Sequence, residues 1–374
     1  MVVNKANTKG RCGRMPKGTT GNSDFLHLSC NEGTGAGDSP FGIGFVLAIV
    51  SRIDYKWCSI SHYDALRHVR KGEVTCMRHR KAGKITDNLW YLGREETGVY
   101  VLEGEESSML INGGICYILP DVLQQMGDLH IHTEKINKLL ILHSHFDHIG
   151  IVPYFARAYP GLEVYASART WGVLTMPKAI EIINDFGKIV STQMGAMEEL
   201  DAFDYQWRDD VAGLTVAEGD SIDLGGVTLS ILDTPGHSSC SISAYEPTMK
   251  ALFASDAGGI PYRNSSFPSA NSNFDQFQES LEKLKPLDVA YLCADHYGYI
   301  TEDEANRFVD ITIEEAHKLR EEIEKCYREL GDLDAAAKVL NASFFEKNPD
   351  YVISPDILEG VFKQMLKHVA KTMQ

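Results

Sequence analysis

Three histidines and an aspartate stand within six residues, directly after an apolar run in the middle of the chain. The run, Leu139–Leu142, predicts a buried β-strand. It is followed, with the spacing His-x-His-x-Asp-His, by His143, His145, Asp147 and His148. Side chains alternate along an extended chain, so the first two imidazoles should face one point, and a tightening of the chain would turn the other two residues towards a second point. Imidazole nitrogens and carboxylate oxygens are ligands that zinc and iron accept, so this spacing predicts a metal site.

Three later apolar runs each predict a strand that leads to another residue able to bind a metal. The runs lie at 227–232, 251–254 and 289–293, and they are short and bounded by polar or turn residues. The ligand-type residues that follow them are His237, Asp256 and His296. Each of these strands therefore delivers one more ligand-type residue near its C-terminal end, in addition to those of the central motif.

This order of strands and ligands resembles that of the metallo-β-lactamase superfamily, over about residues 85–299. The resemblance implies an α/β protein with the metallo-β-lactamase fold, an αββα four-layer sandwich, followed here by a C-terminal helical extension. It also implies that every metal-binding position of the family's dinuclear form is filled. The implied ligands are His143, His145 and His237 for the first metal ion, Asp147, His148 and His296 for the second, and Asp256 as the bridge between them.

The cofactor that this resemblance implies is a pair of divalent metal ions, and His and carboxylate ligands suit zinc and iron alike. Two such ions can share a hydroxide, because they lower the pKa of the parent water to near neutrality. That bridging hydroxide is the expected nucleophile, so the reaction needs no serine or cysteine. Asp147 is the expected catalytic residue as well as a ligand, because its carboxylate can orient or relay the proton.

Shorter stretches are similar to two groups of enzymes within the superfamily. Thr234–His237 resembles the matching segment of the hydroxyacylglutathione hydrolases (glyoxalase II). Residues 165–170, 274–275 and 280–284 are similar to the quinolone-signal-response thioesterases. These likenesses predict hydrolysis of a small thioester or ester. The alternatives are hydrolysis of a phosphodiester or a lactone at the same site, and a regulatory protein whose metals are structural.

The segment 257–268 is a glycine-rich loop that begins beside the expected bridging ligand. A loop in that place is expected to line or cover the site. Its candidate substrate contacts are Tyr262, Arg263 and Phe267.

Position 112 departs from the family pattern. Most members of the superfamily have an aspartate where this chain has Asn112. An amide cannot supply the negative charge that a carboxylate places behind a metal ligand, so the metal affinity or its tuning is expected to differ from the family's.

The chain is expected to divide into three segments. In residues 1–81 basic side chains outnumber acidic ones, and this segment is expected to be poorly structured; translation from Met77 would leave most of it out of the functional protein. Residues 82–300 are expected to form the catalytic domain, and residues 301–374 the C-terminal helical extension. The amphipathic helices of the extension need a partner surface, so they should either cap the sandwich or join two copies in a homodimer.

Charge and composition restrict the partners. The net charge of −16 disfavours nucleic acid, because a polyanion is repelled on average. The longest apolar run, 41–50, is shorter than the roughly 20 residues that span a bilayer, so no membrane partner is expected. Eight scattered cysteines without a Cys-x-x-Cys pair predict free thiols in the cytoplasm. The expected partner is a small-molecule substrate.

Overall fold

The computed structural model describes residues 77–351 and 353–373, and two seven-stranded β-sheets form the centre of this part. The first sheet has the strand order β2-β3-β4-β5-β6-β7-β8. The strands from β2 to β5 form an antiparallel meander, and those from β5 to β8 run parallel. Their bounds are β2 (Gly83–Thr86), β3 (Leu89–Arg94), β4 (Thr97–Glu103), β5 (Ser108–Ile111), β6 (Ile136–Leu140), β7 (Glu163–Ala166) and β8 (Leu214–Thr215).

The second sheet has the order β1-β16-β15-β12-β11-β10-β9. All its neighbouring strands are antiparallel except β12 and β15, which run parallel. Its strands are β1 (Arg78–His79), β9 (Ser221–Asp223), β10 (Thr228–Asp233), β11 (Ile242–Glu246), β12 (Ala251–Phe253), β15 (Tyr291–Cys293) and β16 (Tyr299–Thr301). A separate hairpin pairs β13 (Ile260–Tyr262) with β14 (Ser265–Phe267), within the segment that the sequence predicted to be a loop.

The apolar sequence of β3 shows how one strand serves two cores. Successive side chains of a strand point to opposite faces of its sheet. Leu89 and Tyr91 therefore pack in the layer between the two sheets, together with Ile231 of the second sheet. Trp90 and Leu92 pack on the other face, against the helices that cover the first sheet.

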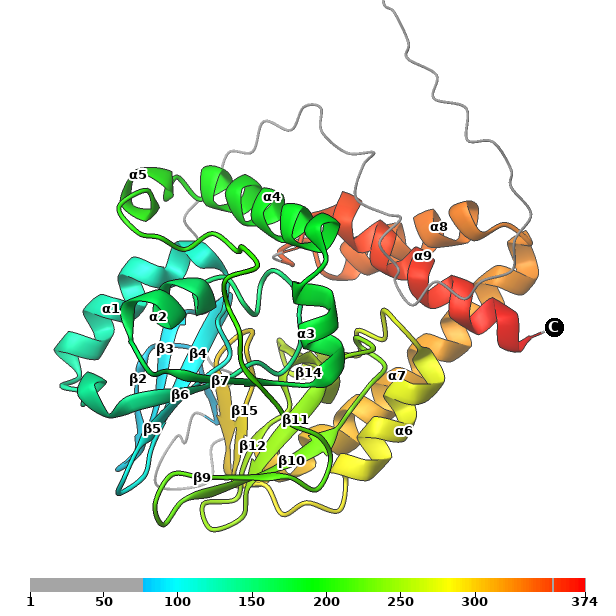
Figure 1. Cartoon of the computed structure of the whole chain (residues 1–374). Coiled ribbons are helices and arrows are strands. Elements are labelled where there is room, and N and C mark those ends of the chain that lie inside the picture. Colours follow the sequence, from blue (N-terminus) through cyan, green and yellow to red (C-terminus); the bar gives the residue numbers. More distant parts are fainter. Residues whose placement is uncertain (1–76, 352, 374) are drawn as a thin grey trace, which may run out of the picture. The chain divides into compact units, whose positions relative to one another are not determined.

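Helices cover the outer face of the first sheet, and Figure 1 shows α1 and α2 there. Three helices, α3 to α5, follow one another between residues 168 and 200. Met176 has an extended backbone because the following Pro177 disfavours the helical conformation in the residue before it. The elements are η2 (Cys116–Ile118), α1 (Leu119–Asp128), η3 (Thr133–Lys135), α2 (Val152–Ala158), α3 (Ala168–Leu174), α4 (Pro177–Gln193) and α5 (Met197–Leu200).

A second group of helices packs on the second sheet, where Figure 1 shows α6 and α7 beside β10 to β12. Their core contains Leu252 and Leu292 from the sheet and Phe308 and Leu366 from the helices. Gly331 ends α7 in the left-handed region (φ 65°), where a residue without a Cβ is least strained. The elements are η4 (Ser255–Gly258), α6 (Phe274–Leu284), α7 (Glu302–Leu330), α8 (Leu333–Lys347) and α9 (Pro355–Thr372).

This arrangement of helices, two sheets and helices confirms the predicted αββα sandwich with C-terminal helices. The predicted poorly structured segment lies outside the described residues, apart from 77–81. Within those, Arg78–His79 pair with β16, so the second sheet begins before the expected boundary at residue 82. No helix of the described part is long and apolar enough to cross a membrane.

The packing of α9 can be tested with two leucines of the C-terminal helices. Leu366→Ala should lower the free energy of unfolding by about 2–5 kcal/mol, because it leaves a cavity in a fully buried cluster. Leu330→Ala is the matched control, and it should cost less than about 0.5 kcal/mol because Leu330 is 45% exposed. Urea unfolding measures both values. Equal costs at the two positions would contradict the described position of α9.

Candidate metal centre

The candidate ligands come from both sheets and meet at one edge. His143 and His145 follow the end of β6 in the first sheet, and the other ligand segments follow β10, β12 and β15 in the second. Because β12 and β15 are parallel neighbours, their carboxyl ends deliver Asp256 and His296 to the same place. The backbone N–H of Ile242 donates to the carbonyl of Leu142 over 2.9 Å, and this hydrogen bond joins the two sheets just before His143.

The structure brings all seven predicted ligands together in overlapping groups. In each group the nearest donor atoms lie within 4.8 Å of one another. The first group is His143, His145 and His237, and the second group is Asp147, His148 and His296. A further group of His143, His148 and Asp256 connects them.

Asp256 lies between the two groups. Its Oδ2 is 3.4 Å from Nε2 of His237 in the first group and 3.4 Å from Nε2 of His148 in the second. Its Oδ1 is 3.6 Å from Nε2 of His296. Burial disfavours the carboxylate, but the charges of the surrounding histidines outweigh it and hold the pKa of Asp256 well below its ordinary value. An ionised carboxylate in this position is suited to bridging two cations.

The ring nitrogens that face the centre have the pattern of metal donors. The Nδ1–H of His237 donates to the carbonyl of Ser269 and that of His296 to the carbonyl of Glu96, each over 2.7 Å. These bonds fix the tautomer and leave each Nε2 as the atom directed at the centre.

Two further observations test whether the residues fit a metal. Nε2 of His143 is buried and has no hydrogen-bond partner among the described residues. Nε2 of His237 lies only 2.9 Å from Nδ1 of His145. A buried polar atom without a partner is costly, and a cation beside these nitrogens would satisfy it. The donor set of imidazoles and carboxylates therefore fits zinc or iron.

The two groups differ in their protonation. Burial lowers the pKa of every histidine in the first group, well below its ordinary value for His143 and to about 3 for His145. Burial acts in the same direction on His148, but the carboxylates of Asp147 and Asp256 outweigh it and raise its pKa well above the ordinary value. At pH 7 the metal-free protein therefore carries neutral imidazoles in the first group and a proton on His148.

Sequence reasoning missed a buried carboxylate directly behind the centre. Asp295 is 2% exposed, and its Oδ2 accepts a hydrogen bond of 2.9 Å from Nδ1 of His148. The same oxygen accepts from Asn112 and Ser255. The only sequence signal was that Asp295 immediately precedes the predicted ligand His296.

The three predicted substrate contacts face the C-terminal helices. The hydroxyl of Tyr262 donates to Asp350 over 2.9 Å, and the guanidinium of Arg263 pairs with the same carboxylate. Phe267 is buried, with its ring centroid 5.2 Å from that of Phe344 in α8. Their role in substrate binding stays a prediction. In the structure they form the contact between the hairpin and the C-terminal segment.

A tyrosine from the segment between α8 and α9 packs against the hairpin. Tyr351 is buried, and its ring centroid is 4.8 Å from that of Tyr262. Tyr262 in turn lies 5.5 Å from the ring of Tyr297, the neighbour of His296. Burial, and then the charges of Tyr297, Asp256, Tyr262 and Asp147, raise the pKa of Tyr351 well above its ordinary value. Its phenol is therefore neutral and lies close enough to the metal centre to feel both carboxylates.

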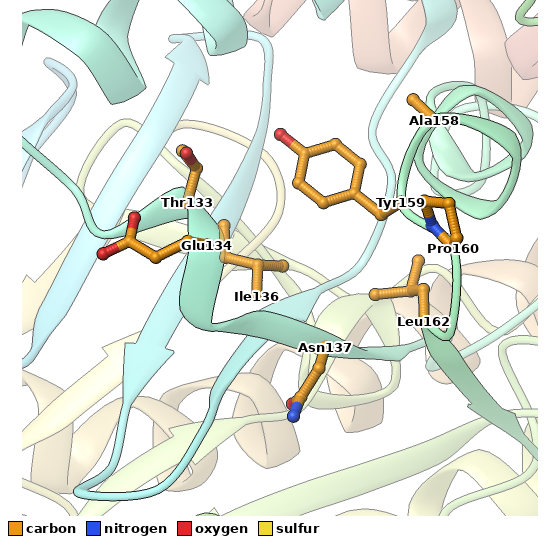
Figure 2. Close-up of a pocket in the computed structure, with 8 residues that line it drawn as sticks. All are labelled: Thr133, Glu134, Ile136, Asn137, Ala158, Tyr159, Pro160 and Leu162. Carbon is orange, nitrogen blue, oxygen red and sulfur yellow. The ribbon is translucent and has the colours of Figure 1, made fainter.

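A surface pocket of about 300 Å³ lies elsewhere in the described part. It is lined by η3, the start of β6, the end of α2 and the turn into β7, and Figure 2 shows Ile136, Tyr159 and Leu162 around it. No candidate ligand lines it, so it is separate from the metal centre.

Comparison with known proteins identifies the family. The model of the family described as "Metallo-beta-lactamase superfamily" matches residues 92–296, which include all seven candidate ligands. The chain belongs to this superfamily, and its buried His and Asp cluster makes it a metal-dependent hydrolase of that group.

Individual relatives are distant. The metallo-beta-lactamase fold-containing protein ST1585 of Sulfurisphaera tokodaii is 25% identical over 52% of this chain and 70% of its own length. The exodeoxyribonuclease WalJ of Streptococcus pneumoniae is 28% identical over 26% of this chain, and the match spans only 34% of WalJ. The structure of the metallo-beta-lactamase family protein TTHA1429 from Thermus thermophilus superimposes with a TM-score of 0.55 at 16% identity, over 77% of this chain and 95% of that one, which shows a shared fold.

Metal binding should release a proton from the second group. A histidine binds a metal only as the neutral imidazole, so loading the metal-free protein at pH 7 should displace about one proton, from His148. Affinity at the second group should therefore rise with pH, whereas the first group, already neutral, should depend on pH much less. Calorimetric titration with zinc in two buffers of different ionisation enthalpy measures the release.

His148→Ala should lower the number of protons released by about one, whereas the exposed and unrelated His317→Ala should leave it unchanged. Zinc binding by the unaltered protein without any proton release would contradict the assigned protonation.

Proposed function

We propose that this protein is a dinuclear metal-dependent hydrolase that acts on a small thioester or ester. The observation that carries the proposal is the position of Asp256, with one carboxylate oxygen directed at both ligand groups. A purely structural zinc site usually has a closed shell of four protein ligands, and two groups of ligands with a carboxylate between them do not have that form. The two ions would be zinc or iron.

When bound, a pair of metal ions would lower the pKa of a shared water to near neutrality and so supply a hydroxide nucleophile. Asp147 would then accept the proton of that water. Its side chain is 19% exposed, whereas that of His148 beside it is fully buried. The carboxylate therefore lies on the open side of the centre, and its Oδ1, the oxygen that does not face His148, can accept the proton of the attacking water.

The choice of a thioester or ester rests on the sequence likenesses of Thr234–His237 and of residues 274–284. A phosphodiester is the second candidate, favoured by the match to the exodeoxyribonuclease WalJ. The net charge of −16 argues against a nucleic acid in that role. A lactone remains compatible with the same chemistry.

A substrate panel tests this proposal. Hydrolysis of acyl thioesters or esters should exceed that of bis-p-nitrophenyl phosphate by more than about tenfold in kcat/KM, and a chelator should abolish it. Asp256→Ala should lose both metal and rate, while the exposed Asp310→Ala on α7 should keep both. An Asp256→Ala protein with both metals and full rate would count against the mechanism, and a preference for the phosphodiester would select the second candidate.

We also propose that the Tyr351 hydroxyl donates a hydrogen bond to the carbonyl oxygen of the substrate. Its neutral phenol can donate a hydrogen bond but is costly to ionise. A donor aimed at the oxygen that gains negative charge lowers the barrier to attack.

Tyr351→Phe removes only this donor and retains the ring that packs on Tyr262. It should lower kcat by about 10²-fold with the metal content unchanged. Tyr245→Phe is the matched control, because its hydroxyl donates to the carbonyl of Asp288 outside the site. Steady-state kinetics with metal analysis decide the question, and an unaltered kcat in Tyr351→Phe would refute this role.

The expected homodimer through the C-terminal helices and the expected cytoplasmic location stay predictions. Three apolar side chains are exposed on α7, α8 and α9, and a second copy could cover them. They are Leu330, Val339 and Ile357.

A further inference from the structure

A buried polar cluster connects the second ligand group to the first. Asp295, Asn112 and Ser255 are all buried at the inner side of the metal centre. The Oδ2 atom of Asp295 accepts hydrogen bonds from the amide of Asn112, the hydroxyl of Ser255 and Nδ1 of His148. One carboxylate oxygen therefore receives three donors, and one of them belongs to a predicted metal ligand.

The cluster also reaches the first ligand group. The hydroxyl oxygen of Ser255 lies 3.2 Å from Nδ1 of His143. The Oδ1 atom of Asn112 accepts from the backbone N–H of Leu142 over 3.0 Å, and Leu142 directly precedes His143. The amide at 112 thus accepts on one side and donates to Asp295 on the other, which a carboxylate at the same position could not do.

The backbone indicates that these positions are tightly specified. Asn112 has φ 63° and Ser255 has φ 49°, both in the left-handed region. Asparagine enters this region more readily than most residues, whereas serine does so at a cost. The surrounding structure must hold Ser255 in this conformation, and the hydrogen bonds of the cluster contribute to that.

We propose that Asp295 is a positioning residue that supplies the buried negative charge behind the metal centre, in place of the carboxylate that position 112 lacks. By accepting from Nδ1 of His148, it turns Nε2 of that ring towards the second ligand group. This inference rests on the proposed function only in that it assumes a metal at the centre. Asn112 then becomes the partner that connects this charge to Leu142 through hydrogen bonds.

An exchange of the two side chains tests the proposal. Asp295→Asn should weaken zinc binding by about 10- to 100-fold, because the partner of a ligating histidine loses its charge. Asn112→Asp should also weaken it, because it replaces the donor to Asp295 with a second buried carboxylate. In the double variant N112D/D295N, the amide at 295 can accept from His148 and donate to the carboxylate at 112, so the pair regains complementary partners.

The double variant should therefore bind zinc at least about tenfold more tightly than the product of the two single effects predicts. The measurement is the Kd for zinc, and the number of ions bound, by competition with a chromophoric chelator. Asp288→Asn is the matched control, because it makes the same chemical change at an exposed residue just before β15. Its Kd should equal that of the unaltered protein.

A structural role alone would give a different result. Circular dichroism and thermal unfolding of the metal-free variants report folding, and Ser255→Ala provides a milder variant that removes one donor if Asp295→Asn does not fold. Ser255→Ala should then weaken zinc binding by several-fold. An unaltered Kd for zinc in folded Asp295→Asn would overturn the proposal, and so would an unaltered Kd in Ser255→Ala if that variant has to replace it. Effects on the Kd that simply multiply in the double variant would also overturn it.

These outcomes separate the inference from the proposed function, because zinc affinity is measured without any substrate. A protein that binds zinc but hydrolyses no compound of the panel would contradict the proposed function and leave the role of Asp295 to be decided by the Kd values. A protein that binds neither zinc nor iron would overturn both.

Discussion

The metal centre buries imidazole nitrogens and carboxylate oxygens at short distances from one another. Several of these atoms lack a favourable partner unless a cation lies between them. Nε2 of His143 is buried without a partner among the described residues, and the ring nitrogens of His145 and His237 lie 2.9 Å apart. The carboxylates of Asp147 and Asp256 do not provide partners for these nitrogens. They raise the pKa of His148 instead and so keep a proton on that ring. The arrangement is therefore stable in a form that contains cations, and binding them contributes to the free energy of folding.

The arrangement of the two sheets brings the ligand segments together at one edge. One ligand segment leaves the first sheet at β6, and the others leave the second sheet at β10, β12 and β15. The parallel pairing of β12 with β15 brings Asp256 and His296 to a common edge, and the bond from Ile242 to Leu142 fixes the first sheet against the second there. A shift of one strand register would separate the groups, because it would turn each side chain to the opposite face.

The sequence predicted the ligands because each one follows a strand, and strands carry a strong local signal. The family resemblance then supplied the way the strands assemble. Asp295 and Tyr351 escaped prediction for a different reason: their importance depends on which distant residues they meet. Asp295 meets Asn112 across 183 positions, and Tyr351 lies in a short segment between two helices. The hairpin β13–β14 was expected as a loop because its glycines and polar residues hide a short alternation.

The candidate metal ligands and the residues that pack on the hairpin β13–β14 come from different parts of the chain. The seven candidate ligands fall within 92–296, the range of the family match, whereas Asp350 and Tyr351 lie beyond it and contact Tyr262. The candidate ligands and the proposed hydrogen-bond donor Tyr351 therefore lie in separate stretches of the polypeptide. Substitutions between α8 and α9 would therefore alter the surroundings of Tyr262 while leaving every candidate ligand in place.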